Sequence, residues 1–307
     1  MNFNKSILCV GETIIDLIGT QLDESLYNNS NYQRHLGGSP TNVAVNLSSM
    51  GFQSHLISTV GDDGLGDFAL SSLKMKGVNT KGIRKDHSNP TSVILVSKST
   101  QTPEFIPFRK ADKFIHMNQI TTDILQSCHL FHTTCFALSE NPARETILKF
   151  AKLAKSMNLI LSIDLNYSNK IWANNTDALL TITEFLNLQP IVKVSDDDCY
   201  RLFEAKNSDD MIFSFFHERG AEMVCLTKGK KGVVLSQKSS ALVITKKALT
   251  IDEIKDATGA GDAFWSGFIA GILNNKSMDE CIDFGQKIAS IKLQNVGGLP
   301  DDIKSLI

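Results

Sequence analysis

The chain has 307 residues, and 42% of them are hydrophobic, so it is long enough to bury a large core. It carries 31 Lys and Arg against 33 Asp and Glu, a formal net charge of −2, with the basic residues spread along the sequence. This balance disfavours a nucleic-acid-binding or membrane-surface protein, because either partner requires clustered positive charge.

Cysteine and apolar patterns narrow the class further. The six cysteines are far apart and form no CxxC pair, which indicates free thiols in a reducing compartment. The N-terminal apolar run is interrupted by Glu12 and Asp16, unlike the apolar segment of a signal peptide. No run of about 18 apolar residues is present, so no transmembrane helix is predicted. We expect a soluble, cytoplasmic protein.

The predicted elements alternate between short apolar runs and segments of helical periodicity. The first strand is predicted at 6–12 and the first helix at 39–51, where Ser39 suits the N-cap and Gly51 the C-terminal stop. Further along we predict strands at 54–61, 128–138, 159–166, 191–195 and 222–229, and helices at 67–77, 141–158, 176–187 and 208–220. This alternation predicts right-handed crossovers and a mostly parallel central sheet with helices on both faces.

Two segments break this rhythm. Residues 18–36 are polar and loosely alternating, and residues 90–114 predict two strands around a Ser/Thr/Pro turn, a hairpin rather than a crossover. A small sheet built from two separated segments accounts for both patterns. We therefore predict one α/β domain over 1–307, with a β-sheet lid formed by about 17–36 and 90–115.

The stretch DATGAGDAFWSGFIAG, residues 256–271, places two glycines and an acid where a helix begins. The helix is apolar nearly all round and should be buried, which leaves its first amides without partners. Gly259 and Gly261 bare those amides, and the helix dipole favours an anion there, beside Asp262 in the first turn. Asp262 as a dipole-compatible cap is the alternative, but it leaves the two-glycine approach unexplained.

Phosphoryl transfer to a hydroxyl is the chemistry that fits this arrangement. Asp262 takes the proton of the attacking alcohol, and the amides of residues 259–261 stabilise the charge on the phosphoryl oxygens. The sequence has no GxxxxGK(S/T) motif, so it is not a P-loop enzyme. It also lacks GxGxxG after the first strand, which disfavours a dinucleotide-dependent oxidoreductase.

A second constellation lies in GGSPTNVAVNLSSMG, residues 37–51. Gly38 permits close backbone approach to a small polar ligand, and Asn42 offers a donor and an acceptor to sugar hydroxyls. Asp16 lies at the end of the first strand pattern, where open α/β sheets bind ligands, and its carboxylate accepts two hydroxyl hydrogen bonds. A capped structural helix explains residues 37–51 equally well when they are taken alone.

Together the stretches at 37–51 and 256–271 resemble the two signatures of the ribokinase or PfkB carbohydrate kinase family. Asn42 and Asp262 are 262 − 42 = 220 positions apart, in family order, and the resemblance covers essentially the whole chain. It implies a ribokinase-like α/β fold, with a central mostly parallel sheet, helices on both faces and a small β-sheet lid over the sugar. It also implies an ATP-dependent sugar kinase with a Mg²⁺-bound nucleotide.

The resemblance implies roles for individual residues. The predicted catalytic residues are Asp262 as the base and Gly259, Ala260 and Gly261 as the anion hole. The predicted sugar contacts are Asp16, Gly38, Asn42, Arg109 and Asn166, and the predicted nucleotide contacts are Ser195, Thr227, Gly229, Gly232 and Gln286. Asp198 of KVSDDD, in place of the family's Glu, is predicted near the Mg²⁺ shell through water. Asp256 and the carbonyls around Gly297 are the predicted site of a monovalent cation such as K⁺.

Three further features narrow the sugar. SPTNVA is similar to fructokinases rather than to ribokinases, which favour GGKGANQA, and FIPFRKAD resembles the fructokinase lid, with Arg109 as a substrate contact. Ser168 stands where many fructokinases and 2-dehydro-3-deoxygluconate kinases carry an Arg, which argues against an acidic sugar. Fructose is therefore the leading acceptor, and ribose, 2-dehydro-3-deoxygluconate or a nucleoside are the alternatives.

Two expectations concern assembly and activity. The open edges of a lid sheet invite pairing with a second copy, so we expect a homodimer through the lid. A sugar- or nucleotide-binding protein that has lost catalysis is the alternative from a different class, and the intact GAGD segment disfavours it.

Overall fold

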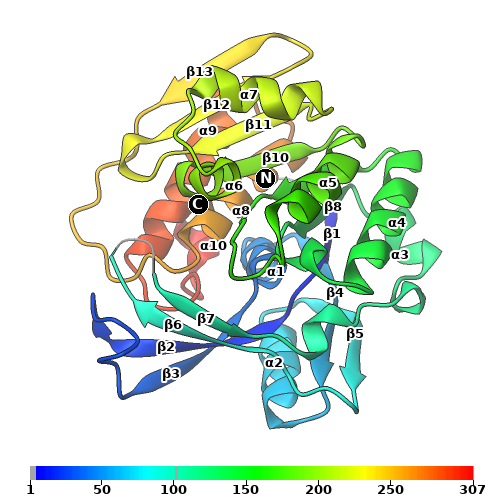
Figure 1. Ribbon diagram of the computed structural model, residues 1–307, viewed down its shortest axis with the longest axis vertical. Helices are drawn as coiled ribbons and strands as arrows, with labels where there is room; N and C mark the ends of the chain where they lie inside the picture. The colour runs from blue at the N-terminus through cyan, green and yellow to red at the C-terminus, as the bar shows by residue number, and fades with distance from the viewer. Residues whose placement is uncertain (1–4, 101–102, 307) are drawn as a thin grey trace.

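The structure is a computed structural model that describes residues 5–100 and 103–306. It is built on a nine-stranded sheet in the order β13-β12-β11-β10-β9-β8-β1-β4-β5 (Figure 1). The strands are β1 (Ser6–Val10), β4 (Gln53–Gly61), β5 (Asn79–Asp86), β8 (Leu130–Thr134), β9 (Ile160–Asp164), β10 (Ile191–Ser195), β11 (Met223–Thr227), β12 (Val233–Gln237) and β13 (Leu242–Lys246). The pairs β11–β12 and β12–β13 are antiparallel, and every other pair in this sheet is parallel.

Helices cover both faces of this sheet. Residues of α1, α8 and α9 share one hydrophobic core, and residues of α4, α5 and α7 share the core on the other face. The helices are α1 (Ser39–Ser49), α2 (Gly64–Met75), α3 (Thr122–Ser127), α4 (Ala143–Ser156), α5 (Asn175–Leu186), α6 (Asp196–Phe203), α7 (Asp209–Glu218), α8 (Ala260–Leu273), α9 (Met278–Leu293) and α10 (Ile303–Leu306). The predicted fold class is confirmed. None of the helices in the described ranges is both long and apolar enough to cross a membrane.

Strand β1 shows why its sequence reads as a continuous apolar run. Leu8 and Val10 belong to the core under α4 and α5, whereas Ile7 and Cys9 belong to the core under α1 and α8. All five residues of the strand are buried. A strand covered on both faces has no side that favours polar residues, so the alternation of a half-exposed strand is absent.

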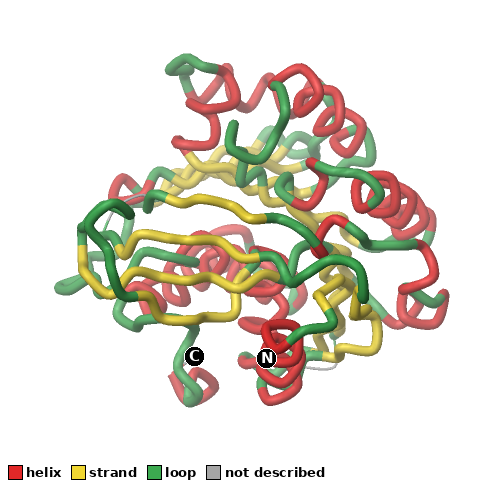
Figure 2. The backbone as a smooth tube through the Cα atoms, turned by 60° about the horizontal axis from the view of Figure 1, so that its bottom comes forward, coloured by secondary structure: helices red, strands yellow, loops and turns green. Residues whose placement is uncertain are grey.

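A second sheet of four strands, in the order β3-β2-β6-β7, is the small sheet of the predicted fold class. Its strands are β2 (Ile14–Leu22), β3 (Tyr32–Gly37), β6 (Val93–Lys98) and β7 (Phe105–Phe108). Strands β6 and β7 pair antiparallel, so the predicted hairpin is confirmed, and part of its turn lies outside the described residues. Figure 2 shows this small sheet at the front of the molecule, apart from the larger sheet.

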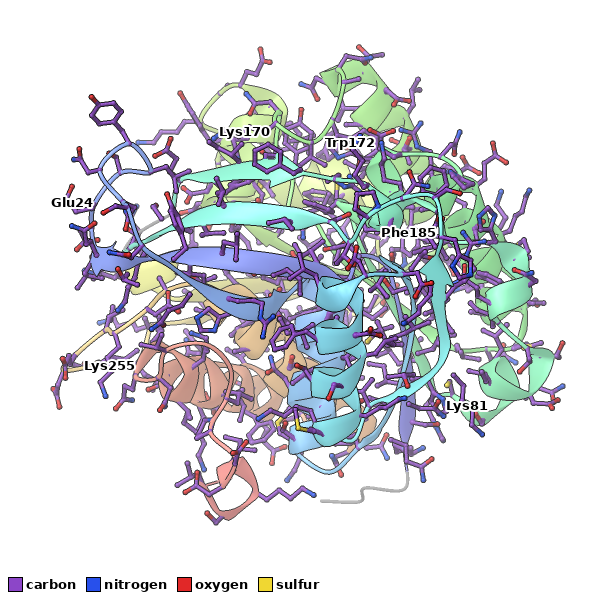
Figure 3. All side chains as sticks on the ribbon, turned by 90° about the horizontal axis from the view of Figure 1, so that it is seen from below. Glu24, Lys81, Lys170, Trp172, Phe185 and Lys255 are labelled. Atoms are coloured by element: carbon purple, nitrogen blue, oxygen red, sulfur yellow. The ribbon has the colours of Figure 1, made fainter. Side chains whose placement is uncertain are left out.

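One chain connection and two hydrogen bonds join the small sheet to the rest of the domain. Strand β2 follows β1 after only the three residues 11–13, so the two sheets are joined directly. Asp63 caps α2 and also accepts a hydrogen bond from the Thr91 amide at 2.8 Å, just before β6. Lys170, labelled in Figure 3, donates from its Nζ to the Phe105 carbonyl of β7 at 2.8 Å.

The prediction for α1 was partly wrong. Gly51, with φ of 106°, follows the helix as predicted. The N-cap, however, is Gly38 rather than Ser39, and no side chain caps the helix. The Ser39 hydroxyl instead donates to Asp262 of α8. The short apolar helix in the sequence thus begins one residue earlier than its serine suggests.

Candidate active site

The order of the large sheet reverses at β1. The chain proceeds outward from β1 through β4 and β5 on one side, and through β8, β9 and β10 on the other. These strands are parallel, so their carboxyl ends lie at one edge, and such a switch point is where open α/β sheets bind ligands. The first turns of α1 and α8 meet at this edge through hydrogen bonds from Ser39 and Asn42 to Asp262.

Asp262 is the centre of the candidate site. It lies in the first turn of α8, after Gly259, which has φ of 76° and no side chain to cap the helix. Its Oδ1 accepts from the Ser39 hydroxyl at 2.6 Å, and its Oδ2 accepts from Asn42 Nδ2 at 2.8 Å. Burial raises the pKa of Asp262, and Lys193 together with these hydrogen bonds opposes the rise. A carboxylate held at fixed orientation with a raised pKa is suited to accept a proton.

The amides at the start of α8 leave fewer free donors than the predicted anion hole assumes. The Ala260 amide donates to the Ala257 carbonyl at 3.2 Å, so it is not free for a ligand. Gly259, with φ of 76° and ψ of 6°, has the conformation of the third residue in a type II turn, which closes that hydrogen bond. Among the described residues, no acceptor takes the amides of Gly259 or Gly261. The anion hole is therefore reduced to these two amides.

Lys193 is a site residue that the sequence analysis missed. Its side chain is 7% exposed, and its Nζ pairs with Asp164 at 2.7 Å. A Cβ added to Gly261 would lie 3.0 Å from Lys193 Nζ, so the ammonium lies beside a free amide of the anion hole. The signal was the lysine inside the apolar strand IVKVS, because lysine is almost never buried without a partner.

Asp16 lies in a different place from the one predicted. Strand β1 ends at Val10, and Asp16 is on β2 of the small sheet rather than at the end of the first core strand. It shares the inward face of β2 with Ile14 and Ile18, which are buried in the core. A Cβ on Gly37 would collide with the Asp16 carboxylate, so a larger residue at 37 would displace this side chain.

Two other carboxylates raise the pKa of Asp16. Burial, and then the carboxylates of Asp262 and Asp256, raise the pKa of Asp16 to about 7.

Gly38, predicted to let a ligand approach the backbone, has φ of 100°, and a Cβ there would collide with the Glu12 carbonyl. Glycine is therefore needed at position 38 because the backbone of Glu12 lies close to it, and not because a ligand does.

Glu12 is a second residue that the sequence analysis missed. Its Oε1 accepts from the Ser39 amide at 3.0 Å, and its Oε2 accepts from the Thr134 hydroxyl at 3.0 Å. Burial raises the pKa of Glu12 to about 8, against the opposing effect of Arg109. Glu12 thus fixes the first turn of α1, from which Ser39 reaches Asp262.

Arg109 and Asn166, both predicted sugar contacts, meet at the backbone of Phe136. Arg109 Nε and Nη2 donate to Asp112 at 2.8 and 2.6 Å, and Nη1 donates to Ser139 and to the Phe136 carbonyl. Asn166 Oδ1 accepts from the Phe136 amide at 3.0 Å. The guanidinium of Arg109 is therefore already engaged by protein acceptors. A direct sugar contact by either residue stays a prediction.

A cleft of about 690 Å³ borders the anion hole. Ala260 and Gly261 line it, so the cleft reaches the first turn of α8. Its lining also includes the five predicted nucleotide contacts, Ser195, Thr227, Gly229, Gly232 and Gln286. Apolar residues such as Val233, Leu249 and Phe264 supply walls suited to a planar base.

Asp198, predicted near the Mg²⁺ shell, is tied into the start of α6, and Asp164 at the end of β9 is a second carboxylate that could serve a metal. Asp198 Oδ2 accepts from the Ser195 hydroxyl at 2.6 Å, and its Oδ1 pairs with Arg201 at 2.7 Å. Asp164 Oδ1 is buried and has no hydrogen-bond partner among the described residues. Mg²⁺ keeps several waters and is usually shared between one or two carboxylates and nucleotide phosphates. This pair of carboxylates fits such a water-separated ion.

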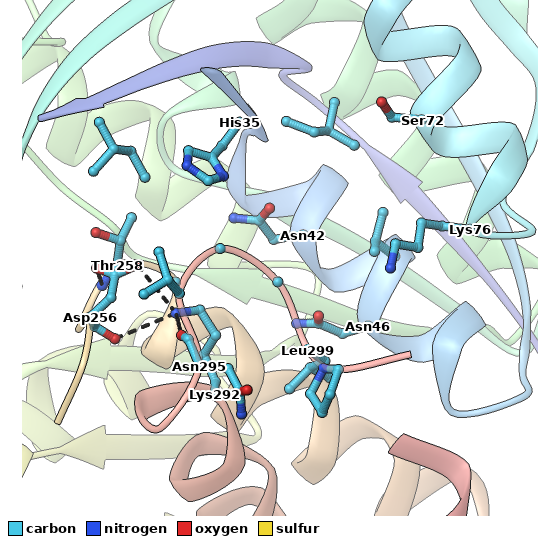
Figure 4. A pocket seen from close by; sticks show the side chains of 18 of the residues that line it. His35, Asn42, Asn46, Ser72, Lys76, Asp256, Thr258, Lys292, Asn295 and Leu299 are labelled. Atoms are coloured by element: carbon cyan, nitrogen blue, oxygen red, sulfur yellow. Dashed lines mark hydrogen bonds and ion pairs between the residues drawn. The ribbon is translucent and has the colours of Figure 1, made fainter. Parts of the chain in front are cut away.

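A second cleft, of about 440 Å³, lies between α1, α2, β3 and the segment after α9 (Figure 4). Asp256 and Gly297, the residues predicted to hold a monovalent cation, both line it. Lys292 reaches the same place, where its Nζ donates to the carbonyls of Asp256 at 3.4 Å and Asn295 at 3.1 Å. The predicted cation site thus contains a positive charge of the chain itself.

Comparisons with known proteins agree with this geometry. The family model described as pfkB family carbohydrate kinase matches residues 4–304. An ATP-dependent 6-phosphofructokinase of Thermoanaerobacterium thermosaccharolyticum is 32% identical over 296 residues, 96% of this chain and 90% of that protein. The structure of a fructokinase from Halothermothrix orenii is 34% identical with a TM-score of 0.80, over 92% of this chain and 97% of that one. An uncharacterised sugar kinase from Pyrococcus horikoshii in complex with ATP is 28% identical with a TM-score of 0.83, over 97% and 96%. From the match along nearly its whole length, the chain belongs to the pfkB family of carbohydrate kinases.

Proposed function

We propose that the protein transfers the γ-phosphoryl group of ATP to a hydroxyl of fructose. One observation carries this proposal: the Asp262 carboxylate lies beside Gly261, which lines the larger cleft, and is bound by Asn42, which lines the smaller one. A base between two clefts is suited to a reaction between two substrates. The fructokinase from Halothermothrix orenii, 34% identical, supports fructose as the acceptor.

Asp262 acts as the general base in this mechanism. A sugar hydroxyl near its carboxylate gives up its proton to Asp262 while the hydroxyl oxygen forms a bond to the γ-phosphorus. The bond between the γ-phosphorus and the bridging oxygen breaks, and ADP leaves with that electron pair. Asp262 then releases the proton to solvent. A raised pKa brings this carboxyl closer to neutral pH, where a general base is most effective.

Preorganised positive groups stabilise the transferring phosphoryl group. The free amides of Gly259 and Gly261 and the ammonium of Lys193 are the donors that lie at this point of the structure. Asp198 and Asp164 would hold Mg²⁺ through water, and the ion would supply charge neutralisation on the nucleotide phosphates. Removing one such donor from an enzyme typically costs about 10²–10³ in rate, so these groups should account for much of the catalysis.

An ATP-coupled assay with a panel of acceptors tests the proposal. The panel contains fructose, ribose, 2-dehydro-3-deoxygluconate and a nucleoside, and we expect fructose to give a kcat/KM at least about tenfold above the others. Equal or faster turnover of another acceptor would reject fructose while leaving kinase activity established. Absence of phosphorylation with every acceptor in the presence of Mg²⁺ and ATP would reject the kinase mechanism itself.

A phosphorylated ketose is the second candidate acceptor. The relative from Thermoanaerobacterium thermosaccharolyticum is a 6-phosphofructokinase, 32% identical to this chain. Arg34 lines the smaller cleft together with Asn42, and its guanidinium lies over the Phe68 ring at 3.8 Å. A guanidinium held at that position is a suitable partner for the phosphate of fructose 6-phosphate. In that case Arg34→Met raises KM for fructose 6-phosphate about tenfold but not KM for fructose, and equal changes in both would exclude this role.

We also propose that two copies pair through the small sheet. Strands β3 and β7 are the edges of that sheet, and Ile106 and Phe108 of β7 are 41% and 54% exposed. Apolar side chains beside an unpaired strand edge favour association. Light scattering is expected to give a dimer for the parent protein and a monomer for Phe108→Glu. A monomeric parent would reject the pairing without affecting the kinase proposal.

A further inference from the structure

The residues predicted to bind a monovalent cation do not fit a free ion, because a lysine already lies among their oxygens. The side chains of Asp256 and Lys292 are 1% and 4% exposed, and Lys292 Nζ lies 3.5 Å from Asp256 Oδ2. The same nitrogen donates to the main-chain carbonyls of Asp256 and Asn295, at 3.4 and 3.1 Å (Figure 4). Three oxygens thus surround this nitrogen: the two carbonyls accept its hydrogen bonds, and Asp256 Oδ2 lies at ion-pair distance without a hydrogen-bond partner among the described residues.

Charge balance also disfavours a second cation at this place. The Asp256 carboxylate and the Lys292 ammonium together are neutral, as a carboxylate and a bound potassium ion would be. An added cation among the same oxygens would lie within a few ångströms of the ammonium, where two positive charges inside a protein repel strongly. Burial lowers the pKa of Lys292, and the carboxylates of Asp256 and Asp262 oppose that effect.

Lys292 is connected directly to the turn that leads into the anion hole. Asp256 Oδ1 accepts from the Thr258 amide at 3.0 Å, so the carboxylate bound by Lys292 also shapes this turn. A Cβ built on Gly259 would lie 3.8 Å from Lys292 Cε, which places the lysine stem alongside the residue before α8. The positive charge of Lys292 also lowers the pKa of Asp262, as one of several groups that do so.

We propose that the Lys292 ammonium is a built-in monovalent cation that positions the turn at 256–259, so that catalysis needs no added K⁺. Lys292 is a positioning residue here, because it acts on Asp262 and Gly259 through the turn and the electric field. The kinetic part of this inference rests on the proposed function. Its structural part does not, because it concerns whether the oxygens of Asp256 and Asn295 accept a free cation.

The first experiment measures thermal unfolding without substrates, in KCl and in choline chloride at matched ionic strength. The parent protein is expected to have the same Tm in both salts. Lys292→Ala removes the ammonium and leaves space among the oxygens, so its Tm falls in choline chloride, and KCl or methylammonium chloride raises it again by roughly 2 °C or more. Lys292→Met fills the space without a charge and should show no such recovery. Lys287→Ala, on the exposed side of the same helix, is the matched control and should behave as the parent.

The second experiment repeats the comparison with turnover. In choline chloride the kcat of Lys292→Ala is expected to fall at least about tenfold, with KM for ATP within about threefold of the parent, and K⁺ or methylammonium should restore at least about threefold. A specific increase of the parent's Tm or kcat in KCl would overturn the inference. So would a Lys292→Ala variant whose Tm and kcat respond to neither cation. The thermal measurement needs no substrate, so it remains decisive even if the proposed acceptor proves wrong.

Discussion

Helices α6 and α8 each carry an aspartate as their third residue, yet they use it in opposite ways. In α6, Asp198 turns back to the N-cap residue Ser195, and its Oδ2 accepts from that residue's hydroxyl at 2.6 Å and from its amide at 3.1 Å. Helix α8 begins after Gly259, which has no side chain for such a capping box, and Asp262 reaches two donors on α1 instead. The N-cap residue thus decides whether an acid in the first turn closes its own helix or serves a site outside it.

Both helix starts border the larger cleft, but they offer it different groups. Ser195 and Asp197 line the cleft at α6, where the capping box uses the amides of Ser195 and Asp198 and the first turn holds three aspartates. Ala260 and Gly261 line it at α8, where the Gly261 amide is free. Free amides at a helix start attract anions, whereas the three aspartates in the first turn of α6 repel them, so the phosphates are expected at α8 and not at α6.

Asp262→Asn gives the largest expected effect and tests the role of the first turn of α8, which has no capping box. The amide cannot accept a proton from the sugar, so kcat should fall by about 10³-fold, within the range for loss of a general base. Binding of ATP and of sugar should persist, because Gly259, Gly261 and Asp16 are unchanged. Steady-state kinetics and isothermal titration calorimetry check the two statements. A variant with parent-like kcat would remove Asp262 from the role of base.

Gly261→Ala tests the free amide itself. The new methyl group would lie 3.0 Å from Lys193 Nζ and beside the approach to the anion hole, so we expect kcat to fall by about 10–100-fold. Alanine is the better helix former by up to about 1 kcal/mol, so the free energy of unfolding should not fall. Gly64→Ala in α2, where an added Cβ would meet no atom within 4 Å, is the control and should leave kcat unchanged. A loss of stability without loss of kcat would contradict the assignment.

The pH dependence of kcat/KM tests Asp16, which is predicted to bind the sugar. The pKa of Asp16 is raised from 3.8 to about 7, so Asp16 is mostly protonated at pH 6 and loses acceptor capacity there. We expect kcat/KM to fall about tenfold per pH unit below that pKa. The free energy of unfolding should change with pH in the opposite direction. The folded state binds the Asp16 proton more tightly than the unfolded state does. The stability contributed by Asp16 is therefore present at acidic pH and lost as pH rises towards 7. A flat kcat/KM profile down to pH 5 would contradict this account.

Asp198→Asn gives the smallest expected change in rate. It weakens the capping box of α6 and the ion pair with Arg201, so the free energy of unfolding should fall by about 1 kcal/mol. Because Asp198 is proposed only for the water-separated shell of Mg²⁺, kcat should fall less than tenfold at saturating Mg²⁺. Chemical denaturation and Mg²⁺ titration of the rate check both. A loss as large as that of Asp262→Asn would show that the two helix starts are equivalent in catalysis.

The fold could be predicted to the level of its layers. Strands such as β10 at 191–195 and helices such as α7 were predicted from the length and periodicity of their apolar patterns. The parallel sheet was predicted from the alternation of strands and helices. The antiparallel strands β12 and β13 were not predicted, although each begins with three consecutive apolar residues, VVL and LVI. Gly267 and Gly271 of α8 allow close approach to α9, because a Cβ added at either would lie 2.8 Å from an atom of that helix.

The part of the site that could be predicted consists of residues that lie in sequence motifs of known chemistry. Asp262 and Asn42 lie in recognisable motifs, and the structure brings them within 2.8 Å. Lys193 and Glu12 could not be recognised so readily, because their roles depend on partners distant in the sequence. The partner of Lys292 could not be foreseen either, since helical periodicity gives no reason for a buried lysine near the end of α9.

The hydrogen bonds that hold Asp262 join residues 223 and 220 positions apart in the chain. Closure of such long loops carries a high entropic cost, and contacts of this kind slow folding. During synthesis, most of the chain leaves the ribosome before the base has been made, so no N-terminal fragment can assemble the centre. In refolding experiments, recovery of turnover should therefore lag behind recovery of helical circular dichroism. The length of that lag would measure how long α1 and α8 take to come together after their helices have formed.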